Sequence, residues 1–331
     1  MTSSATWTKP FENYKAPVAL ADIQAARERL RRVALRTPLV RLNVEDGRAE
    51  IYLKLENLQP VGSFKLRGAG NALLLASPQE LREGVWTASA GNMALALAWQ
   101  ARSLGVACTA IVPEDAPVAK LDPLKRLGAQ VIKVPFADYQ QIQREHRYEG
   151  MLGRLIHPFA DAAVMAGNGV IGLEILEDLP DLQTLIIPYG GGGLSCGIAS
   201  AVRALKPEVH ILAAETETAA PLAASLAAGR PVKVAYTPSF ISGIGAPFVF
   251  EDMWPLASAL LDGSVAVSLE EVRQAMRSMG EHNHIITEGA GAVATAAALS
   301  GKAGSGKIVC IVSGGNIDRG VFAKILQSEG I

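Results

Sequence analysis

Residues 190–193 are all glycine, and they follow the apolar segment TLIIPY and precede a segment predicted to be helical. Consecutive glycines leave their backbone N–H groups unobstructed, and the start of a helix adds positive potential, so the pattern indicates a phosphate site. An ordinary strand-to-helix turn is the alternative, but such a turn rarely needs four glycines.

Lys65 is the residue best placed to act as a nucleophile. It follows a Gly-Ser turn and lies between Phe64 and Leu66. Most helical lysines point to solvent, but a partly desolvated amine loses its proton more readily and can attack a carbonyl carbon.

Two more short segments contain polar groups where strands are predicted to end. Ser89-Ala90-Gly91-Asn92 follows the apolar residues 85–88, and Ser313-Gly314-Gly315-Asn316 follows IVCIV. The first could hold a carboxylate through backbone N–H groups and side chains, although a plain helix N-cap is an equal alternative. The second would place Ser313 at the carboxyl end of a buried strand, where open α/β sheets bind ligands.

Two nucleotide motifs were considered for the phosphate and set aside. The glycine run does not fit the G-x-G-x-x-G spacing of a dinucleotide site, although Glu215 ends the next strand where an acid could hold a ribose. Residues 301–307 fit G-x-x-x-x-G-K, but Ile308 follows and the segment runs into a strand, so the match is accidental.

The elements that position these segments alternate between strands and helices. Helices are expected at residues 17–36, 64–76, 93–103, 120–127, 137–150, 170–178, 194–205 and 291–299, with a last helix near the C-terminus. Strands are expected at 50–56, 85–88, 108–112, 130–134, 184–187, 210–215 and 307–312. Because the strands are short and apolar, we predict an α/β fold with parallel sheets covered by helices on both faces.

Composition excludes several classes of protein. The 331 residues are 49% hydrophobic and 5% aromatic, with a formal charge of −1. This composition supports a packed core and argues against disorder, a nucleic-acid partner and a sheet-only fold. The three scattered cysteines predict neither a disulfide framework nor a zinc site. With no secretory signal and no apolar stretch long enough for a membrane helix, we expect a cytoplasmic protein.

In this order, the four segments resemble the pyridoxal-phosphate enzymes of the tryptophan-synthase-β type (fold type II). Within that group they are most similar to the branch of threonine/serine dehydratases and serine racemases. The segment KLENLQPVGSFKLRGA is very specific, and TASAGN, HPF with AGNGVIGLEIL, GGGGLSCG and VSGGN support it independently. The resemblance runs from about residue 23 to the last helix. It implies a large cofactor-binding domain of residues 1–83 and 160–331 and a small inserted domain of residues 84–159.

The resemblance also implies roles for individual residues. Lys65 would bond to the aldehyde of pyridoxal 5'-phosphate and later take the Cα proton. Phe64 would pack beside the ring, Asn92 would bind the ring 3-hydroxyl and Ser313 would meet the ring nitrogen. The phosphate would be held by Gly190, Gly191, Gly192, Gly193 and Leu194. The substrate carboxylate would be wrapped by Ser89, Ala90, Gly91, Asn92 and Met93. A glutamate at the position of Glu288 lies behind the ring in the family.

The activity implied is that of an ammonia-lyase, or dehydratase. It would convert a β-hydroxy amino acid such as L-threonine or L-serine into a 2-oxo acid and ammonia by α,β-elimination, and a homodimer is expected by analogy. The alternatives are an amino-acid racemase, a β-replacement synthase and a catalytically silent binder. A racemase needs a second base on the opposite face of the ring. Ala90 stands where the racemase branch has a serine hydroxyl, which favours dehydration.

Other departures from the family concern the substrate and a metal. Val61, Met93 and Ser242 replace residues usual near the substrate, so a bulkier β-hydroxy amino acid, such as a phenylserine or a hydroxyectoine-derived acid, is an alternative substrate. Some relatives bind a divalent cation after the strand that follows the glycine loop. Glu215 matches the first acid of that site, but Pro221 stands at the second, so no metal is expected. Glu217 could substitute for the missing acid, which keeps the question open.

Overall fold

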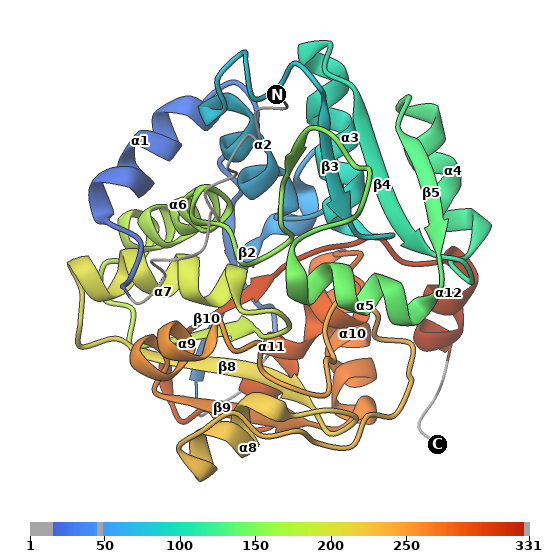
Figure 1. Cartoon of the computed structure of the whole chain (residues 1–331). Coiled ribbons are helices and arrows are strands. Elements are labelled where there is room, and N and C mark those ends of the chain that lie inside the picture. Colours follow the sequence, from blue (N-terminus) through green and yellow to red (C-terminus); the bar gives the residue numbers. More distant parts are fainter. Residues whose placement is uncertain (1–15, 45–48, 328–331) are drawn as a thin grey trace, which may run out of the picture.

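The computed structural model describes residues 16–44 and 49–327 (Figure 1). Residues 1–15, where the sequence predicts no secretory signal, lie outside these ranges. The large domain predicted at residues 1–83 and 160–331 therefore extends beyond the described residues at both of its ends. Within the described residues, the strands form one sheet of six and one of four. None of the helices in these ranges is both long and apolar enough to span a bilayer.

The six-stranded sheet has the order β1-β2-β10-β7-β8-β9. Its strands are β1 (Leu39–Arg41), β2 (Ala49–Leu55), β10 (Gly306–Val312), β7 (Thr184–Pro188), β8 (His210–Thr216) and β9 (Gly263–Val267). Every neighbouring pair is parallel except β1 with β2, so the predicted parallel sheet has one antiparallel edge strand. Sequence analysis did not predict the edge strands β1 and β9.

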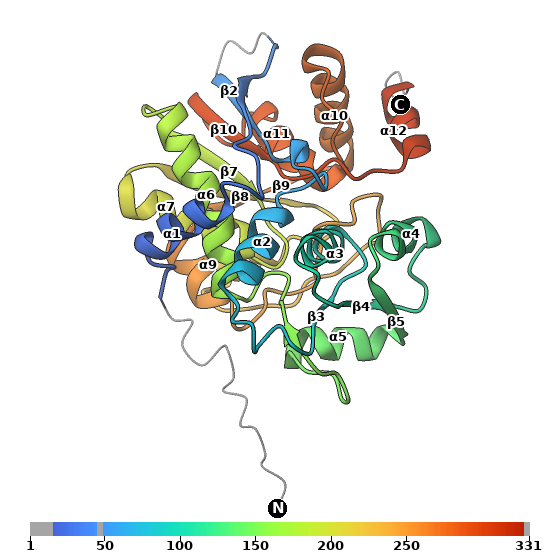
Figure 2. The same ribbon diagram turned by 90° about the horizontal axis from the view of Figure 1, so that it is seen from above.

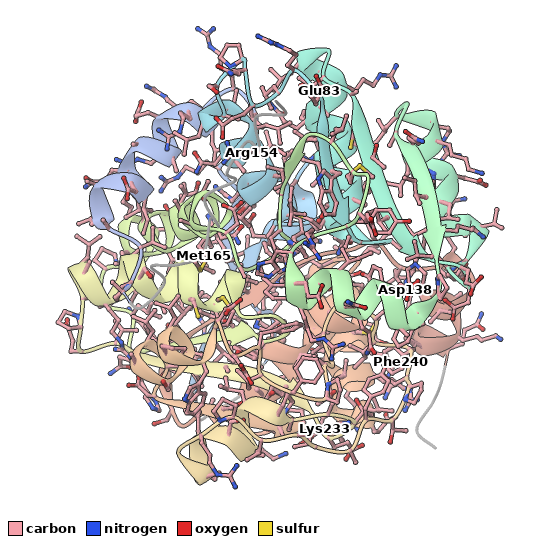
Figure 3. The ribbon with its side chains drawn as sticks, viewed as in Figure 1. Glu83, Asp138, Arg154, Met165, Lys233 and Phe240 are labelled. Carbon is pink, nitrogen blue, oxygen red and sulfur yellow. The ribbon has the colours of Figure 1, made fainter. Side chains whose placement is uncertain are left out.

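Both faces of this sheet are covered by helices, as the apolar strands predict. Along β7, Leu185 and Ile187 pack into one core, while Ile186 packs into the other. The first core lies under α1 (Leu20–Leu30), α6 (Ala162–Asp178), α7 (Gly193–Leu205) and α9 (Trp254–Leu260). The second lies under α10 (Leu269–Asn283) and α11 (Gly289–Leu299), with α12 (Arg319–Gln327) packed on α10. Side chains fill these layers, among them Met165 of α6 (Figure 3).

The four-stranded sheet is parallel throughout, with the order β5-β4-β3-β6. Its strands are β5 (Gln130–Val134), β4 (Cys108–Pro113), β3 (Val85–Ala88) and β6 (Arg154–Leu155). One face packs on α3 (Asn92–Leu104) and α4 (Val118–Arg126), and the other on α5 (Phe136–Glu145). All four strands fall inside residues 84–159, although the domain boundaries themselves stay a prediction.

Helix α2 (Lys65–Leu75) lies between the two sheets. It packs against α6 on one side and α3 on the other (Figure 2). Eight of its eleven residues are buried. The helix that carries the predicted nucleophile is therefore held by both halves of the molecule.

The predicted site segments all follow the carboxyl ends of strands. Residue 56 follows β2, residue 190 comes shortly after β7, residue 313 follows β10 and residue 89 follows β3. Because β2, β10 and β7 are parallel neighbours, their carboxyl ends meet at one edge of the large sheet. This edge is where the site is assembled.

Several helices differ from the expected ranges. Helix α6 begins at Ala162, eight residues before the expected start, because the Asp161 side chain accepts a hydrogen bond from the backbone N–H of Val164 and caps it. Helix α10 was not predicted, although Ser268 and Glu271 form a capping box at its start. Sequence analysis also missed α8 (Pro221–Ala228) and α9.

Candidate active site

Lys65 is the first residue of α2 and is half-buried as a whole residue. Its Nζ donates a 2.5 Å hydrogen bond to the carbonyl oxygen of Pro158 and lies 5.0 Å from the centre of the Phe64 ring. Burial lowers the pKa of the amine to about 8. The neutral, nucleophilic form is therefore much more populated near neutral pH than in an exposed lysine.

The segment that faces Lys65 is held in place by His157. The Nδ1 of this buried ring accepts a 2.9 Å hydrogen bond from the backbone N–H of Ala160, and Nε2 lies 3.2 Å from the Gln143 carbonyl oxygen. This pairing requires a neutral ring with its proton on Nε2. Burial lowers the pKa of His157 well below its ordinary value, in agreement. The turn formed by residues 157–160 places the Pro158 carbonyl oxygen within hydrogen-bonding distance of Lys65 Nζ and the Phe159 ring against the glycine loop.

The glycine loop needs its glycines for two separate reasons. Gly192 has φ +90°, which favours glycine. A Cβ on Gly191 would overlap the Phe159 ring, and a Cβ on Gly193 would lie 2.6 Å from the Phe159 Cα. The loop runs directly into α7, so its backbone N–H groups and the helix N-terminus face the same place.

Ser313 is tied to the turn that carries Lys65. The backbone N–H of Phe64 donates a 3.0 Å hydrogen bond to the Ser313 carbonyl oxygen, and Ser63 forms an antiparallel bridge with Gly314. The Ser313 side chain is buried next to this bridge. The structure thus brings Phe64, Lys65 and Ser313 together, as the sequence predicts.

Asn92 joins the small sheet to the large one. Its side-chain N–H donates a 2.7 Å hydrogen bond to Glu288 Oε1, and its side-chain oxygen accepts a 2.8 Å hydrogen bond from Asn316. Glu288 also donates its backbone N–H to the Gly314 carbonyl oxygen, which places it beside Ser313. Burial raises the pKa of the Glu288 carboxyl to about 7, against a smaller opposing effect of the Asn92 hydrogen bond.

The segment predicted to wrap the substrate carboxylate lies at the start of α3. Ser89 and Ala90 are half-buried, and Gly91 is exposed. The Ser89 hydroxyl accepts a 3.2 Å hydrogen bond from the Gly91 backbone N–H. The Met93 side chain packs into the core beneath α3, so only its backbone can face a ligand.

The described residues fit the phosphate ester of an aldehyde cofactor. Lys65 supplies the amine, and the glycine loop supplies the anion cradle. Beside the loop, the buried hydroxyl groups of Tyr189 and Ser195 have no hydrogen-bond partner, and the same is true of Ser63 next to Phe64. Buried polar atoms without partners are costly, so these hydroxyls are available to a polar group that the protein itself does not provide.

The Glu215 carboxylate accepts hydrogen bonds from protein donors. Its oxygens accept hydrogen bonds from the backbone N–H groups of Leu222 and Ala223 and from the Ser264 hydroxyl. The Glu217 carboxylate accepts a hydrogen bond from the backbone N–H of Leu269. In residues 16–44 and 49–327, no three His, Cys, Asp or Glu residues gather in a way that could hold a metal ion. The absence of a metal stays a prediction.

A family model described as pyridoxal-phosphate dependent enzyme matches residues 30–314. The chain belongs to this family. The L-threonine ammonia-lyase of Thermotoga maritima is 40% identical over 314 residues, which cover 94% of this chain and 78% of that protein. The catabolic L-threonine dehydratase of Staphylococcus aureus is 38% identical, over 91% of this chain and 90% of that protein.

Solved structures of the same family are also similar. Serine racemase from Dictyostelium discoideum matches with a TM-score of 0.83 and 34% identity, over 92% of this chain and 100% of that chain. The T.th. threonine deaminase matches with a TM-score of 0.83 and 33% identity, over 91% of this chain and 99% of that chain. The predicted family, the cofactor pyridoxal phosphate, the α/β fold and the class of pyridoxal-phosphate-dependent lyase are confirmed. The role of each site residue stays a prediction.

Sequence analysis missed residues that complete the site. It assigned no role to Pro158 or Phe159, whereas the Pro158 carbonyl contacts Lys65 and Phe159 covers the glycine loop. It also assigned no role to Asn316, which binds Asn92 and the Val61 carbonyl oxygen. The family motifs HPF and VSGGN contain these residues and are the signals that could have found them. His282 and His284 are exposed: His282 lies in the last turn of α10, and His284 is the residue that follows its end.

The glycine loop yields a double-mutant prediction. We expect Gly191→Ala to weaken binding of pyridoxal phosphate about tenfold, because the new methyl group overlaps the Phe159 ring and shifts the phosphate donors. Adding Phe159→Ala removes that overlap and should restore part of the affinity. Gly193→Ala meets backbone atoms of residue 159, so the same second change should restore little. Quenching of protein fluorescence by added cofactor measures all four variants. Equal rescue of both glycine variants would contradict the account.

Glu288 yields a prediction for the stability of the cofactor-free protein. With a pKa of about 7 when folded and 4.5 when unfolded, the unfolded chain releases this proton first as pH rises. The free energy of unfolding should therefore fall by up to about 3 kcal/mol between pH 4.5 and 7 and stay at the lower value above that range. Glu288→Gln should remove this fall and melt above the wild type at pH 8. Melting curves from pH 5 to 8 provide the test, with exposed Glu281→Gln as control. Parallel curves for wild type and Glu288→Gln would show that Glu288 is not the cause.

Proposed function

We propose that this chain is a pyridoxal-phosphate-dependent ammonia-lyase. It converts a β-hydroxy amino acid such as L-threonine or L-serine into a 2-oxo acid and ammonia. The observation that carries the proposal is the buried Lys65 amine, whose pKa is lowered to about 8, held next to the segment that covers the glycine loop. The names of the two similar lyases, from Thermotoga maritima and Staphylococcus aureus, support the same reaction and substrate class.

The chain's own residues divide the work of holding the cofactor. Lys65 would bond to its aldehyde, Phe64 would lie beside its ring, and Ser313 would meet the ring nitrogen. Residues 190–194 and the N-terminus of α7 would hold the phosphate. When bound, pyridoxal phosphate supplies an electron sink for the electrons left behind at the substrate Cα.

Substrate binding and proton transfer would be carried out by groups near the same edge of the large sheet. Backbone N–H groups of residues 89–93, with the Ser89 and Asn92 side chains, would hold the substrate carboxylate. The Lys65 amine would accept the Cα proton at Nζ, for which a lowered pKa is suited. The β-hydroxyl group then leaves with a proton, and the released enamine hydrolyses in water to the 2-oxo acid and ammonia.

Amino-acid racemisation is the second candidate, because serine racemase is among the similar structures. A racemase delivers a proton to the opposite face of Cα and needs a donor there. Ala90, half-buried in the substrate segment, has none. Elimination is therefore the main reaction in our proposal. Val61 and Ser242 leave a bulkier β-hydroxy substrate as the alternative within the lyase class, whereas the Met93 side chain lies in the core and does not contribute to that alternative.

We further propose that the protein is a cytoplasmic homodimer. Free, buried cysteines suit a reducing compartment, and burial raises the pKa of Cys108 and Cys196 to about 12, which makes them unreactive. The homodimer rests on analogy with the family alone.

The reaction is tested with a panel of β-hydroxy amino acids. We expect L-threonine or L-serine to release ammonia and a 2-oxo acid in equal amounts. Lys65→Ala should lose the visible absorption band of the lysine-bound cofactor and at least about 10²- to 10⁴-fold in rate, the range for loss of a general base. Exposed Lys125→Ala is the control and should behave as wild type. A wild-type protein that shows the band but releases no ammonia from any member of the panel would overturn the proposal.

The role of Ala90 is tested by giving it a hydroxyl group. Ala90→Ser should raise the rate of D-amino acid formation at least about tenfold relative to elimination, because it supplies a proton donor at that face. Ala90→Gly adds no donor and should not. Chiral chromatography of the amino acid measures both variants. No gain of D-isomer in Ala90→Ser, under conditions where elimination persists, would refute this reading of Ala90.

A further inference from the structure

Behind the helix that carries Lys65 lies a buried cluster of four charged side chains. They come from β2, the following turn, α2 and α6, and each is at most 4% exposed: Lys54, Glu56, Arg67 and Glu174. Two positive and two negative charges balance. None of the four belongs to the proposed cofactor or substrate site.

Arg67 is the centre of this cluster. Its Nε and Nη2 atoms donate 2.8 Å hydrogen bonds to the two carboxylate oxygens of Glu56. Its Nη1 and Nη2 atoms donate 2.8 Å hydrogen bonds to the two carboxylate oxygens of Glu174. Bidentate ion pairs of this kind fix both the distance and the orientation of the groups they join. Arg67 therefore ties α2 to the end of β2 and to α6.

The other members complete the hydrogen bonding. Lys54 Nζ lies 2.6 Å from Glu174 Oε2 and donates to the Thr37 carbonyl oxygen at 2.6 Å. The Thr37 hydroxyl and the Gln59 amide both donate to Glu56. Burying four charges is expensive, and replacing such a cluster by well-packed apolar side chains of similar volume is often neutral or stabilising. What the charged cluster adds is one fixed geometry.

That geometry is passed directly to the Lys65 amine. Arg67 is two residues from Lys65 in the first turn of α2. Helix α2 touches α6 without room for even one methyl group, because a Cβ on Gly68 would lie 2.7 Å from the Val164 side chain. Helix α6, which Arg67 binds through Glu174, begins three residues after Phe159. The segment that contains Pro158, the contact of Lys65, therefore leads directly into this helix.

We propose that Arg67 is a positioning residue for Lys65: its two carboxylate pairs set where the amine lies relative to the Pro158 carbonyl and the glycine loop. The inference rests on the proposed function, because it concerns the same amine. It does not depend on which β-hydroxy amino acid is the substrate.

The test compares variants that separate position from buried charge. Arg67→Met alone leaves an unbalanced negative charge, whereas Arg67→Met with Glu56→Gln keeps one Lys54–Glu174 pair and restores the balance. Arg67→Lys keeps every charge but cannot form bidentate hydrogen bonds with both Glu56 and Glu174. Arg27→Met breaks an exposed ion pair between α1 and Glu177, one turn further along α6, and is the matched control.

In the balanced double variant we expect a melting temperature close to that of wild type. We also expect kcat to be about 100-fold lower, the cost of misplacing a catalytic group by about 1 Å, with KM changed little. Two readouts do not depend on turnover. The rate at which added pyridoxal phosphate becomes trapped on the lysine by borohydride should fall, and the pH at which the visible band changes should shift. Arg67→Lys should show the same pattern, and Arg27→Met should match wild type.

Wild-type kcat, trapping rate and pH profile in the balanced double variant would overturn the proposal. If that variant melts too early to assay, Arg67→Lys decides by the same criteria. Failure of the proposed function has a different signature, since wild type itself would then show no band or no ammonia release. An altered trapping rate in an Arg67 variant would still support the positioning role if only the substrate assignment were wrong.

Discussion

Removal of the Lys65 amine from water is the physical constraint on which the site depends. A buried ammonium group is costly, and this cost lowers its pKa to about 8. The amine keeps one backbone acceptor, the Pro158 carbonyl, which orients it without adding a negative charge that would favour the protonated form. A lysine so placed can be both a nucleophile toward an aldehyde and a base toward a substrate proton.

The rest of the molecule maintains this placement from several sides. The α/β architecture brings the turn after β2, the loop after β7 and the segment after β10 to one edge of the large sheet. His157 shapes the segment that meets both Lys65 and the glycine loop. Asn92, through Glu288 and Asn316, connects the small sheet to the same place. The site is therefore the meeting point of elements from both sheets and depends on their relative position.

How much of this could be predicted from the sequence depends on how local each feature is. The glycine run, the turn before Lys65 and Ser313 after its strand are short patterns, so these candidate residues could be found locally. The α/β fold followed from the alternation of short apolar strands with helices, and the roles of the individual site residues followed from the resemblance to the family. The Pro158 contact could not be predicted, because a backbone carbonyl has no residue signature. The Arg67 pairs could not either, since Glu56 and Glu174 lie 11 and 107 residues away. The edge strands β1 and β9 were missed because pairing with neighbours, and not their own pattern, makes them strands.

The central claim is that Lys65, and no other lysine, bonds to pyridoxal phosphate. Borohydride reduction of the loaded protein fixes the cofactor on its lysine, and mass spectrometry of the digested protein then locates it. The account predicts the added mass on the peptide that contains Lys65 and on no other peptide. Label on a different lysine, such as the exposed Lys120, with Lys65 unmodified, would contradict it.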